Sequence, residues 1–459
     1  MPDLSNNHKR LLIYLFGTIN LIAIILLWWH HSGSLVTSGT SGDTLIGFGR
    51  IMGLLGEFFI LVELVLIGRI TWLEQLFGFD KMNKIHRWIG YGILIFFIGH
   101  PLLTVMGYAE HNGVSSISQF IAFLNLGEYV RGIIGFVLFF VAIFISFPYI
   151  RKRFRYETWY FTHLVMYAAI VLVLGHQTFA DATAITQEPA LHGFTTSGDL
   201  SQGLILYYWL VINYGVLALV LLYRFVRPYY LFRKHRFYVE KIVPETKDVY
   251  SVYITGRNMD KYTFASGQYA NLTFLQKGMW FTHPFSFSSA PNGKYLRFSI
   301  KSLGDFTSTI SKLKIGTKVV IDGPMGLFVE SQAKTTKFLL IAGGIGITPI
   351  RALIETLSEK SRDIILLYSS KDKNDIAFKN ELEALSIKHH FIISQVIEDE
   401  KMSYEKGRID KEKITRLVPD YLERDIYVCG PTPMMKAVVS HVKELGVPNN
   451  QIHFEKFSY

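Results

Sequence analysis

Four histidines lie inside long apolar stretches of the sequence, His86 and His100 in one and His163 and His176 in another. Ionisable residues are costly in a bilayer and are usually functional there. At about 1.5 Å per residue, fourteen helical residues separate His86 from His100 by roughly 21 Å, which leaves room for two haems across a core about 30 Å thick. A lone membrane histidine is more often a packed residue, but two matched pairs favour two haems, each held by one imidazole from each stretch.

Six apolar stretches are long enough to cross a bilayer as helices, and two of them would position these histidines. They cover residues 11–29, 46–70, 85–108, 130–148, 159–177 and 204–223. The first stretch is too long, and lacks a small-residue cleavage site, to be a convincing signal peptide. We therefore expect a six-helix transmembrane bundle in the first half of the chain.

Basic residues mark one side of this bundle. They precede the first stretch and follow the second, fourth and sixth, whereas the loops 30–45, 109–129 and 178–203 contain no lysine or arginine. Because cytoplasmic loops carry the excess of Lys and Arg, we expect a plasma-membrane protein with both termini and the whole C-terminal half in the cytoplasm. The formal net charge of +10 is then an orientation signal, and no nucleic-acid partner is expected.

The topology pairs the histidines by depth. His86 and His163 fall near the cytoplasmic face, whereas His100 and His176 fall near the outer face, so the expected ligand pairs are His86 with His163 and His100 with His176. At about 100° per residue, His86 and His100 share a helix face, but His163 and His176 lie roughly 140° apart. Either the two haems are rotated relative to one another or the second helix is locally distorted.

Glycines beside the histidines admit two interpretations. Gly90, Gly92 and Gly99 could let a flat macrocycle approach the backbone, or they could pack helices as small residues commonly do in membranes. Pro101 is expected to bend the helix next to His100.

Charged residues within these stretches are equally open to interpretation. Arg50 and Arg131 at the outer ends could pair with haem propionates or attract an anionic product, and Arg69 could serve the inner haem in the same way. Snorkelling to the interface explains each arginine equally well. Glu57 and Glu63 could face a wet cavity or a proton path, or each could pair with an arginine.

The second half of the chain has the pattern of a soluble protein. Short alternating strands from 235 to about 330 predict a small antiparallel barrel. Beyond them, KFLLIAGGIGITPIRALIETL and DIYVCGPTPMMKAVVSHVKEL each contain a strand, a turn and a helix, which predicts a parallel sheet covered on both faces. The single cysteine, Cys429, excludes an internal disulfide framework and a cysteine-ligated metal cluster.

Taken in order, these motifs resemble the ferric reductase and NADPH oxidase superfamily, in which a six-helix haem domain is fused to a ferredoxin-reductase-like flavin and nicotinamide module. The resemblance rests on the two histidine pairs and on GRIMGLLG (49–56), HPFSFSSAP (283–291), GDFTSTI (304–310), GGIGITP (343–349), CGPTPMM (429–435) and the terminal FEKFSY. Each motif is weak alone, but their order and spacing are specific. The resemblance implies a transmembrane haem domain over 1–230, an FAD-binding β-barrel domain over 231–332 and an NAD(P)-binding α/β domain over 333–459.

The resemblance also implies where FAD binds. The HPFSFSS segment would lie along the flavin, with Ser286 placed to hydrogen-bond the isoalloxazine near N5. Soluble relatives usually have Arg-x-Tyr-Ser here, and Lys301 stands where relatives often have arginine in the segment that holds the pyrophosphate. The residues implied to bind FAD are His283, Pro284, Phe285, Ser286, Phe287, Ser289, Lys301, Gly304, Phe306 and Thr307.

The glycine-rich turn is implied to bind the nicotinamide cofactor, although it is not the G-x-G-x-x-G turn of the Rossmann fingerprint. Cys429 either borders the nicotinamide or is an inert core thiol. Tyr459 is implied to stack on the flavin and to yield to the nicotinamide; with Ser286 and Cys429 it completes the implied catalytic set. The implied nicotinamide-side residues are Gly343, Gly344, Gly346, Thr348, Pro349, Ser370, Lys371, Arg408, Cys429, Gly430, Pro431 and Tyr459.

Lys371 and Arg408 modestly favour NADPH over NADH, because basic residues at a strand end can meet a 2′-phosphate. Solvated loop charge is the alternative for Lys371.

By this resemblance the chain is an enzyme. NAD(P)H would deliver hydride to FAD, FAD would supply single electrons to the inner of two b-type haems, and the outer haem would pass them to a small-molecule acceptor outside. Dioxygen, giving superoxide, and chelated ferric iron both fit, and the HPFSFSS pattern leans toward the oxidase side. A different class of interpretation keeps the helices as a membrane anchor or proton channel for a flavin reductase. No obligate protein partner is evident.

Overall fold

The computed structural model describes residues 6–37, 39–154, 156–178, 200–397 and 405–455. They form two compact units. The first comprises Met1–Gly68 and Met82–Val220, and the second comprises Arg69–Lys81 and Leu221–Tyr459. The segment Arg69–Lys81, which lies between two apolar helices in the sequence, therefore belongs to the second unit.

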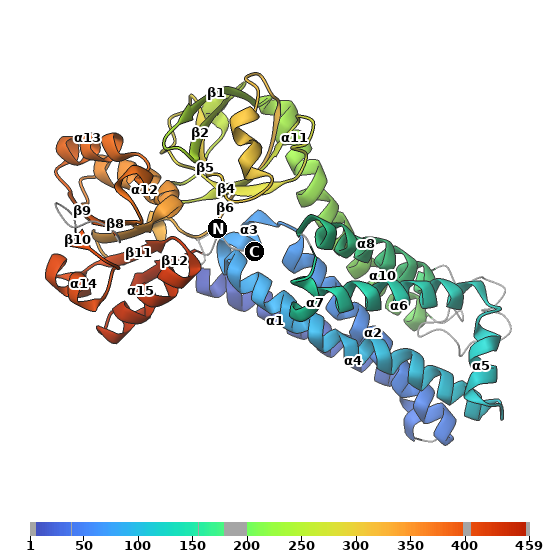
Figure 1. The fold of residues 1–459 in the computed structure, drawn as a ribbon. Helices are drawn as coiled ribbons and strands as arrows, with labels where there is room; N and C mark the ends of the chain where they lie inside the picture. Colours follow the sequence, from blue (N-terminus) through green and yellow to red (C-terminus); the bar gives the residue numbers. More distant parts are fainter. Residues whose placement is uncertain (1–5, 38, 155, 179–199, 398–404, 456–459) are drawn as a thin grey trace. The chain divides into compact units, whose positions relative to one another are not determined.

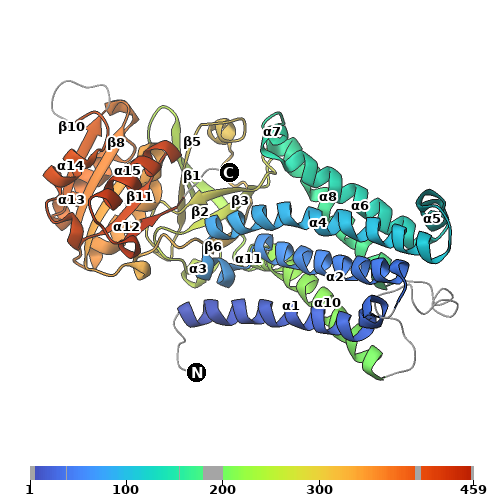
Figure 2. The same ribbon diagram turned by 90° about the horizontal axis from the view of Figure 1, so that it is seen from below.

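The first unit consists of helices joined by turns (Figures 1 and 2). Its described helices are α1 (Asn6–Thr37), α2 (Ser41–Ile67), α4 (Phe79–His111), α5 (Ser116–Phe123), α6 (Gly127–Ser146), α7 (Pro148–Arg151), α8 (Tyr156–Thr178) and α10 (Leu200–Leu221). Helix α2 begins with a capping box, because the Thr40 side chain accepts from Asp43 N while the Asp43 carboxylate accepts from Thr40 N. The indole of Trp28 donates to Gly47 O at 2.9 Å and joins α1 to α2.

Within the described residues, four helical stretches are long and apolar enough to cross a membrane, namely Asn6–His30, Phe79–His111, Tyr129–Ser146 and Tyr207–His235. The expected second span over 46–70 is wrong at its end: α2 stops at Ile67, and α3 (Thr71–Phe77) follows across a 90° bend. Arg69 has a φ of 55°, which a right-handed helix does not accommodate. Helix α8 holds a shorter apolar stretch, Thr158–Leu174. The count of six spans stays a prediction.

In the second unit, α11 (Arg227–His235) leads into two three-stranded antiparallel sheets. One has the order β1 (Tyr238–Pro244), β2 (Val249–Thr255), β5 (Leu296–Lys301), and the other has β4 (His283–Ser286), β3 (Tyr269–Phe274), β6 (Val319–Met325). They share one apolar core, which includes Val252, Leu272 and Phe298, all 0% exposed. Single antiparallel bridges, Tyr238 with Lys318 and Phe287 with Phe298, join residues of the two sheets.

A six-stranded parallel sheet follows, as predicted. Its order is β10 (Glu405–Lys406), β9 (Ile392–Ile397), β8 (Asp363–Ser370), β7 (Lys337–Gly343), β11 (Asp425–Cys429), β12 (Ile452–Phe454). Its helices are α12 (Ile347–Glu359), α13 (Lys379–His389), α14 (Lys411–Leu417) and α15 (Thr432–Glu444). Because successive side chains of β7 point to opposite faces of the sheet, Leu340 packs in a core with α12 and α13, whereas Leu339 packs in a core with α14 and α15. Both faces of the sheet are therefore covered.

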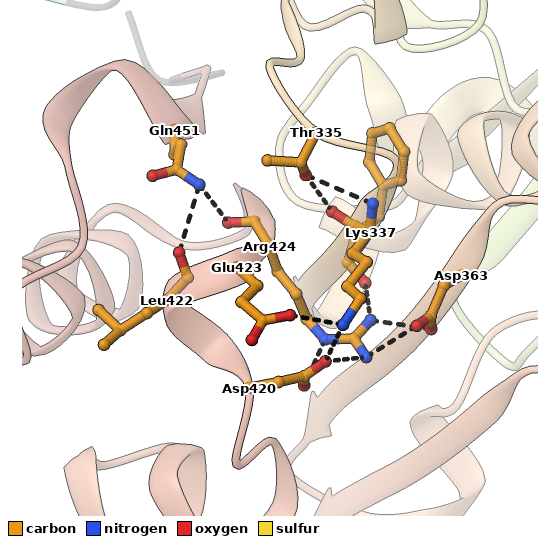
Figure 3. Close-up of polar contacts among 9 residues, drawn as sticks. Thr335, Lys337, Asp363, Asp420, Leu422, Glu423, Arg424 and Gln451 are labelled. Atoms are coloured by element: carbon orange, nitrogen blue, oxygen red, sulfur yellow. Dashed lines mark hydrogen bonds and ion pairs between the residues drawn. The ribbon is translucent and has the colours of Figure 1, made fainter.

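An ionic cluster closes the amino edge of this sheet (Figure 3). Arg424, 4% exposed, lies 2.9 and 3.1 Å from the two oxygens of Asp363, and 2.7 and 2.8 Å from those of Asp420. Lys337 Nζ lies 3.2 Å from Asp420 and 2.6 Å from Glu423. Ligands of open α/β sheets bind at the opposite, carboxyl edge, so this cluster stabilises the sheet away from the cofactor side.

Candidate functional site

Three of the four predicted haem ligands have described side chains, and all three lie in the first unit. His86 and His100 belong to α4 and His163 to α8, whereas His176 lies in α8 with its side chain outside the described residues. The rings of His86 and His163 have centres 6.3 Å apart and planes at 88°. Since an imidazole nitrogen binds a transition metal at about 2 Å, two rings facing one metal ion have centres about 6 Å apart. The predicted inner pair has the spacing that a shared iron needs.

Hydrogen bonds assign the tautomers of two of these rings. His100 Nδ1 lies 2.9 Å from the backbone oxygen of Gly49, which can only accept, so Nδ1 carries the hydrogen and donates. His163 Nδ1 lies 3.1 Å from the hydroxyl oxygen of Ser146. That hydroxyl donates its own hydrogen to Ala142 O at 2.7 Å, so Nδ1 of His163 also donates.

The third ring, His86, bonds a carboxylate through the same nitrogen, because its Nδ1 contacts Glu63 Oε2. An ionised carboxylate only accepts, so Nδ1 donates here too. In all three rings Nε2 keeps its lone pair, and no described residue bonds it. Metal-ligating histidines typically donate their other ring N–H to a carboxylate, carbonyl or similar acceptor, so these residues fit haem iron.

Helix α2 supplies the partners of both histidines on α4. Gly49 and Glu63 stand fourteen residues apart on α2, as His86 and His100 do on the antiparallel α4. Helix α2 also approaches closely, since a Cβ added at Gly53 would lie 2.8 Å from His100 Nδ1. Sequence reasoning did not assign these partners, and its only signals were the GRIMGLLG motif and the buried acid at 63.

The open questions about buried charges are partly answered. Glu63 pairs with His86 rather than with an arginine. Glu57 is 2% exposed, and its Oε1 has no partner within the described residues. Arg50 Nη1 donates to Ser32 Oγ at 3.3 Å, while its Nε and Nη2 have no described partner. A Cβ at Gly92 would meet nothing within 4 Å, so space is open beside α4 there.

The predicted flavin segment forms β4 and the residues after it. Ser286 pairs with Tyr269 of β3 and is buried. Phe287 is 0% exposed and stacks on Phe264 at 4.0 Å between ring centres, so it is a core residue of the sheets. Ser289 is also buried, and its hydroxyl has no partner in the described part of the chain. A buried hydroxyl without a partner fits a ligand contact.

The predicted pyrophosphate segment forms a tight turn. The Thr307 hydroxyl accepts from Leu303 N at 2.9 Å and from Gly304 N at 3.0 Å. A Cβ at Gly304 would meet nothing within 4 Å, so the chain itself leaves the space beside this turn open. Lys301 Nζ lies 3.3 Å from Asp248, and this ion pair accounts for its charge within the protein.

Two glycine-containing motifs meet at the carboxyl edge of the parallel sheet. Ala342 of β7 pairs with Cys429 of β11, which brings the turns after both strands together. A Cβ at Gly346 would lie 2.3 Å from Cys429 O, and one at Gly343 would lie 2.2 Å from Met434 Sδ. At Gly346, where the neighbouring atoms belong to the backbone, only glycine permits this approach. The structure therefore joins GGIGITP to CGPTPMM as the resemblance implied.

Other nicotinamide-side residues surround this edge. Thr348 donates to Ile345 O at 3.0 Å and, with Pro349, lies in the first turn of α12. Cys429 is 0% exposed, and burial raises the pKa of its thiol, which favours the neutral thiol. Lys371 follows β8 and is exposed.

Arg408 follows β10, and both β8 and β10 pair with β9. The two bases flank one strand end, where a phosphate could lie. Tyr459 is outside the described residues.

A cluster that sequence reasoning missed ties the antiparallel sheets to the parallel-sheet lobe. Arg297 of β5, 4% exposed, lies 2.9 and 3.0 Å from the two oxygens of Glu381 and 2.8 Å from Glu245. Arg351 of α12 also contacts Glu381 and donates to Ser288 O at 3.1 Å. The helix after the glycine turn is thereby attached to the predicted flavin strand.

Arg69 forms an ion pair with a residue of the second unit. Its Nη1 lies 3.2 Å from Asp322 of β6, to which Arg227 also bonds at 3.3 Å. On α3, Glu74 accepts from the hydroxyl of Tyr269 at 2.6 Å. Burial raises the pKa of Glu74 to about 7. The sequence left haem pairing and snorkelling open for Arg69 and did not predict this ion pair, which forms because the loop packs within the second unit.

Three segments of the chain match known family models. Residues 52–174 match the ferric reductase like transmembrane component, 236–329 match an FAD-binding domain and 340–440 match an oxidoreductase NAD-binding domain. The chain therefore combines a membrane domain with the FAD- and NAD-binding domains of an oxidoreductase.

Curated relatives carry reductase modules. The chain is 28% identical over 236 residues to the glycine betaine monooxygenase reductase subunit of Chromohalobacter salexigens, covering 49% of this chain and 64% of that protein. It is 29% identical over 242 residues to a flavohemoprotein of Bacillus anthracis, covering 48% and 60%. The chain thus spans less than two thirds of the length of these relatives.

Two solved structures match about half of this chain. The flavohem-like FAD/NAD-binding domain of nitric oxide dioxygenase from Vibrio cholerae O1 biovar El Tor matches 48% of this chain and 96% of that chain, at 24% identity and a TM-score of 0.44. The ferredoxin reductase in carbazole 1,9a-dioxygenase matches 48% and 68%, at 23% identity and a TM-score of 0.43.

Proposed function

Because the chain belongs to the ferric reductase and NADPH oxidase superfamily by its three matched domains, we propose that it passes electrons from cytoplasmic NAD(P)H, through FAD and two b-type haems, to an acceptor on the outer side. The observation that carries this proposal is the set of three histidines whose Nδ1 atoms donate and whose Nε2 atoms keep their lone pairs. His86 and His163 would hold the inner haem, and His100 and His176 the outer one.

The reductase residues have separate tasks. Ser286 and Ser289, with the turn closed by Thr307, would hold FAD, while the turns that meet at Gly343 and Gly346 would hold the nicotinamide cofactor against it. When bound, FAD and haem supply the conversion of a two-electron donor into one-electron steps. Tyr459 would cover the flavin until nicotinamide displaces it. NADPH is favoured over NADH on Lys371 and Arg408.

The apolar helices support a membrane location, and the basic loops favour both termini in the cytoplasm. We propose that this membrane is the plasma membrane. If each iron is held by two histidines, no coordination position would remain for the acceptor, which would then be reduced at the haem edge.

Dioxygen is slightly favoured as acceptor, giving superoxide, and a ferric chelate is the alternative. The guanidinium of Arg50, with two nitrogens that no described residue bonds, suits a haem propionate or an anionic product.

The competing function is a membrane-anchored flavin reductase without a haem relay. Purified protein in detergent with added FAD, reduced by dithionite and assayed for haem, separates the two. We expect b-type bands and two haems per chain, reducible by NADPH without oxygen. Absence of haem bands from protein that still reduces FAD would support the anchor instead. Superoxide dismutase-sensitive reduction of cytochrome c, compared with formation of ferrous iron from a ferric chelate, identifies the acceptor.

A further inference from the structure

The three candidate haem ligands with described side chains differ in the charge of the group that accepts the hydrogen bond from Nδ1. His100 donates to a backbone carbonyl and His163 to a hydroxyl, both neutral acceptors. The Ser146 hydroxyl also accepts from the indole of Trp159 at 3.2 Å, which weakens it as an acceptor for His163. His86 alone donates to a carboxylate, that of Glu63. Among the three candidate ligands whose side chains are described, His86 is therefore distinguished by a negatively charged partner.

That charge is directed at the histidine. The side chain of Glu63 is 13% exposed, and its other oxygen, Oε1, has no hydrogen-bond partner in the described part of the chain. Glu57, two turns earlier on α2, is more deeply buried, at 2% exposed, and makes no ion pair with any of the histidines among the described residues. The two acids thus share a helix and an apolar setting and differ in contact with a ligand.

We propose that Glu63 is a positioning residue that lowers the reduction potential of the inner haem relative to the outer one; this inference rests on the proposed function. A hydrogen bond to an ionised acceptor is roughly twice as strong as one between neutral groups, and it makes the imidazole a stronger donor to the metal. A stronger donor and a nearby negative charge both favour the more positive, oxidised iron. His100, held by a backbone carbonyl, lacks this effect, and the difference favours transfer from the inner to the outer iron.

The test measures the inner site alone. In a His100→Ala background, which is expected to retain only the inner haem, Glu63→Gln should shift the reduction equilibrium at least tenfold toward the reduced form. For a one-electron couple that is an upward change of about 59 mV in midpoint potential. Spectroelectrochemical titration of the haem band gives the value without any turnover. Glu57→Gln, the matched control on the same helix, should leave the equilibrium within about twofold by the same conversion.

The outcomes are distinguishable. Retained haem with an unchanged potential in Glu63→Gln, or an equal shift in Glu57→Gln, overturns the role of Glu63 and leaves the haem relay standing. Lack of haem in the unmodified protein overturns the proposed function itself. If Glu63→Gln loses its haem, Glu63→Asp tests the proposal instead. Because aspartate keeps the carboxylate, the reduction equilibrium of the haem should stay within about twofold of the parent, whereas a tenfold shift toward the reduced form would contradict the proposal.

Discussion

The two compact units hold their proposed redox groups by different means. The membrane unit relies on single side chains, and each of the three described candidate ligands has one polar partner at Nδ1. The reductase unit relies on backbone, where glycines let two strand ends meet with no side chain between them. In the first unit, function is therefore lost when a side chain is removed, and in the second it is lost when one is added.

The largest effect is expected in the membrane unit. His86→Ala or His163→Ala should remove the inner haem and abolish electron transfer to the outer one, while leaving NAD(P)H-dependent flavin reduction intact, because the flavin site lies in the other unit. His100→Ala should instead leave the inner haem reducible. Haem content per chain and stopped-flow spectra measure this. If these variants and His176→Ala all kept two haems, the ligand assignment would be wrong.

In the reductase unit, the corresponding variant adds one methyl group. Gly346→Ala places a Cβ 2.3 Å from the backbone oxygen of Cys429, and overpacking of this kind costs about 1–3 kcal/mol or more. We expect a lower melting temperature without ligand and a large loss in kcat/KM for NADPH. Gly304→Ala is the control, since its Cβ meets nothing within 4 Å. It should keep the unliganded stability and weaken FAD binding only. Equal destabilisation by both would contradict this account of the glycines.

Variants of two equally buried arginines distinguish an effect on stability from an effect on hydride transfer. Arg297 joins the antiparallel sheets to α13, whereas Arg424 joins groups within the parallel-sheet lobe (Figure 3). Arg297→Met and Arg424→Met should each destabilise the protein by roughly 3–5 kcal/mol, because each removes a buried guanidinium and takes from one carboxylate, Glu245 or Asp363, the ion pair that the described residues give it. Only Arg297→Met should also slow flavin reduction by NADPH in stopped flow. Equal slowing in both would show that the cluster between the lobes has no positioning role.

A smaller effect depends on pH through Glu74. Burial, with a further contribution from Asp322, raises the pKa of Glu74, whereas the Tyr269 hydroxyl, Arg69 and the Gly326 backbone lower it, leaving it at about 7 against 4.5 unfolded. The folded state binds the proton more tightly, so this contribution to stability is complete below about pH 4.5 and is lost as pH rises through 7. We expect a change of order 1–3 kcal/mol in the unfolding free energy. Glu74→Gln should flatten that part of the profile, and an unchanged profile would refute it.

The smallest effect concerns cofactor choice. Lys371→Glu should raise the KM for NADPH about fivefold or more, equivalent to about 1 kcal/mol, and change that for NADH much less, because only NADPH carries the 2′-phosphate. Steady-state kinetics with both cofactors measures this. Equal changes would assign Lys371 to solvated loop charge.

Much of the architecture could be predicted from the sequence because its signals are local. Apolar stretches, alternating strands and glycine-rich turns are read within about twenty residues, and the parallel sheet formed as expected. The placement of His86 and His100 on one helix was predicted by counting residues, and both lie on α4. The end of α2 was mispredicted because hydropathy does not register the left-handed turn at Arg69.

The partners of the site residues could not be predicted, for a different reason. Gly49 acts through its backbone oxygen, and Glu63 meets His86 only because α2 and α4 pair in one register. The contact of Arg297 with Glu381 spans 84 residues. Arg69 was assigned to the membrane unit by its place in the sequence, although its loop packs on β6. Such contacts depend on tertiary packing that no short pattern encodes.

Transfer of electrons across the membrane tests the central claim most directly. Protein would be reconstituted in vesicles with the reductase unit facing outward and oxidised cytochrome c trapped inside, and NADPH would be added outside. We predict reduction of the trapped cytochrome c that depends on FAD and disappears in His86→Ala and in His100→Ala, while both variants still oxidise NADPH with an external flavin acceptor. Reduction inside the vesicles that persists in both histidine variants, or its absence from intact protein carrying two haems, would contradict the account.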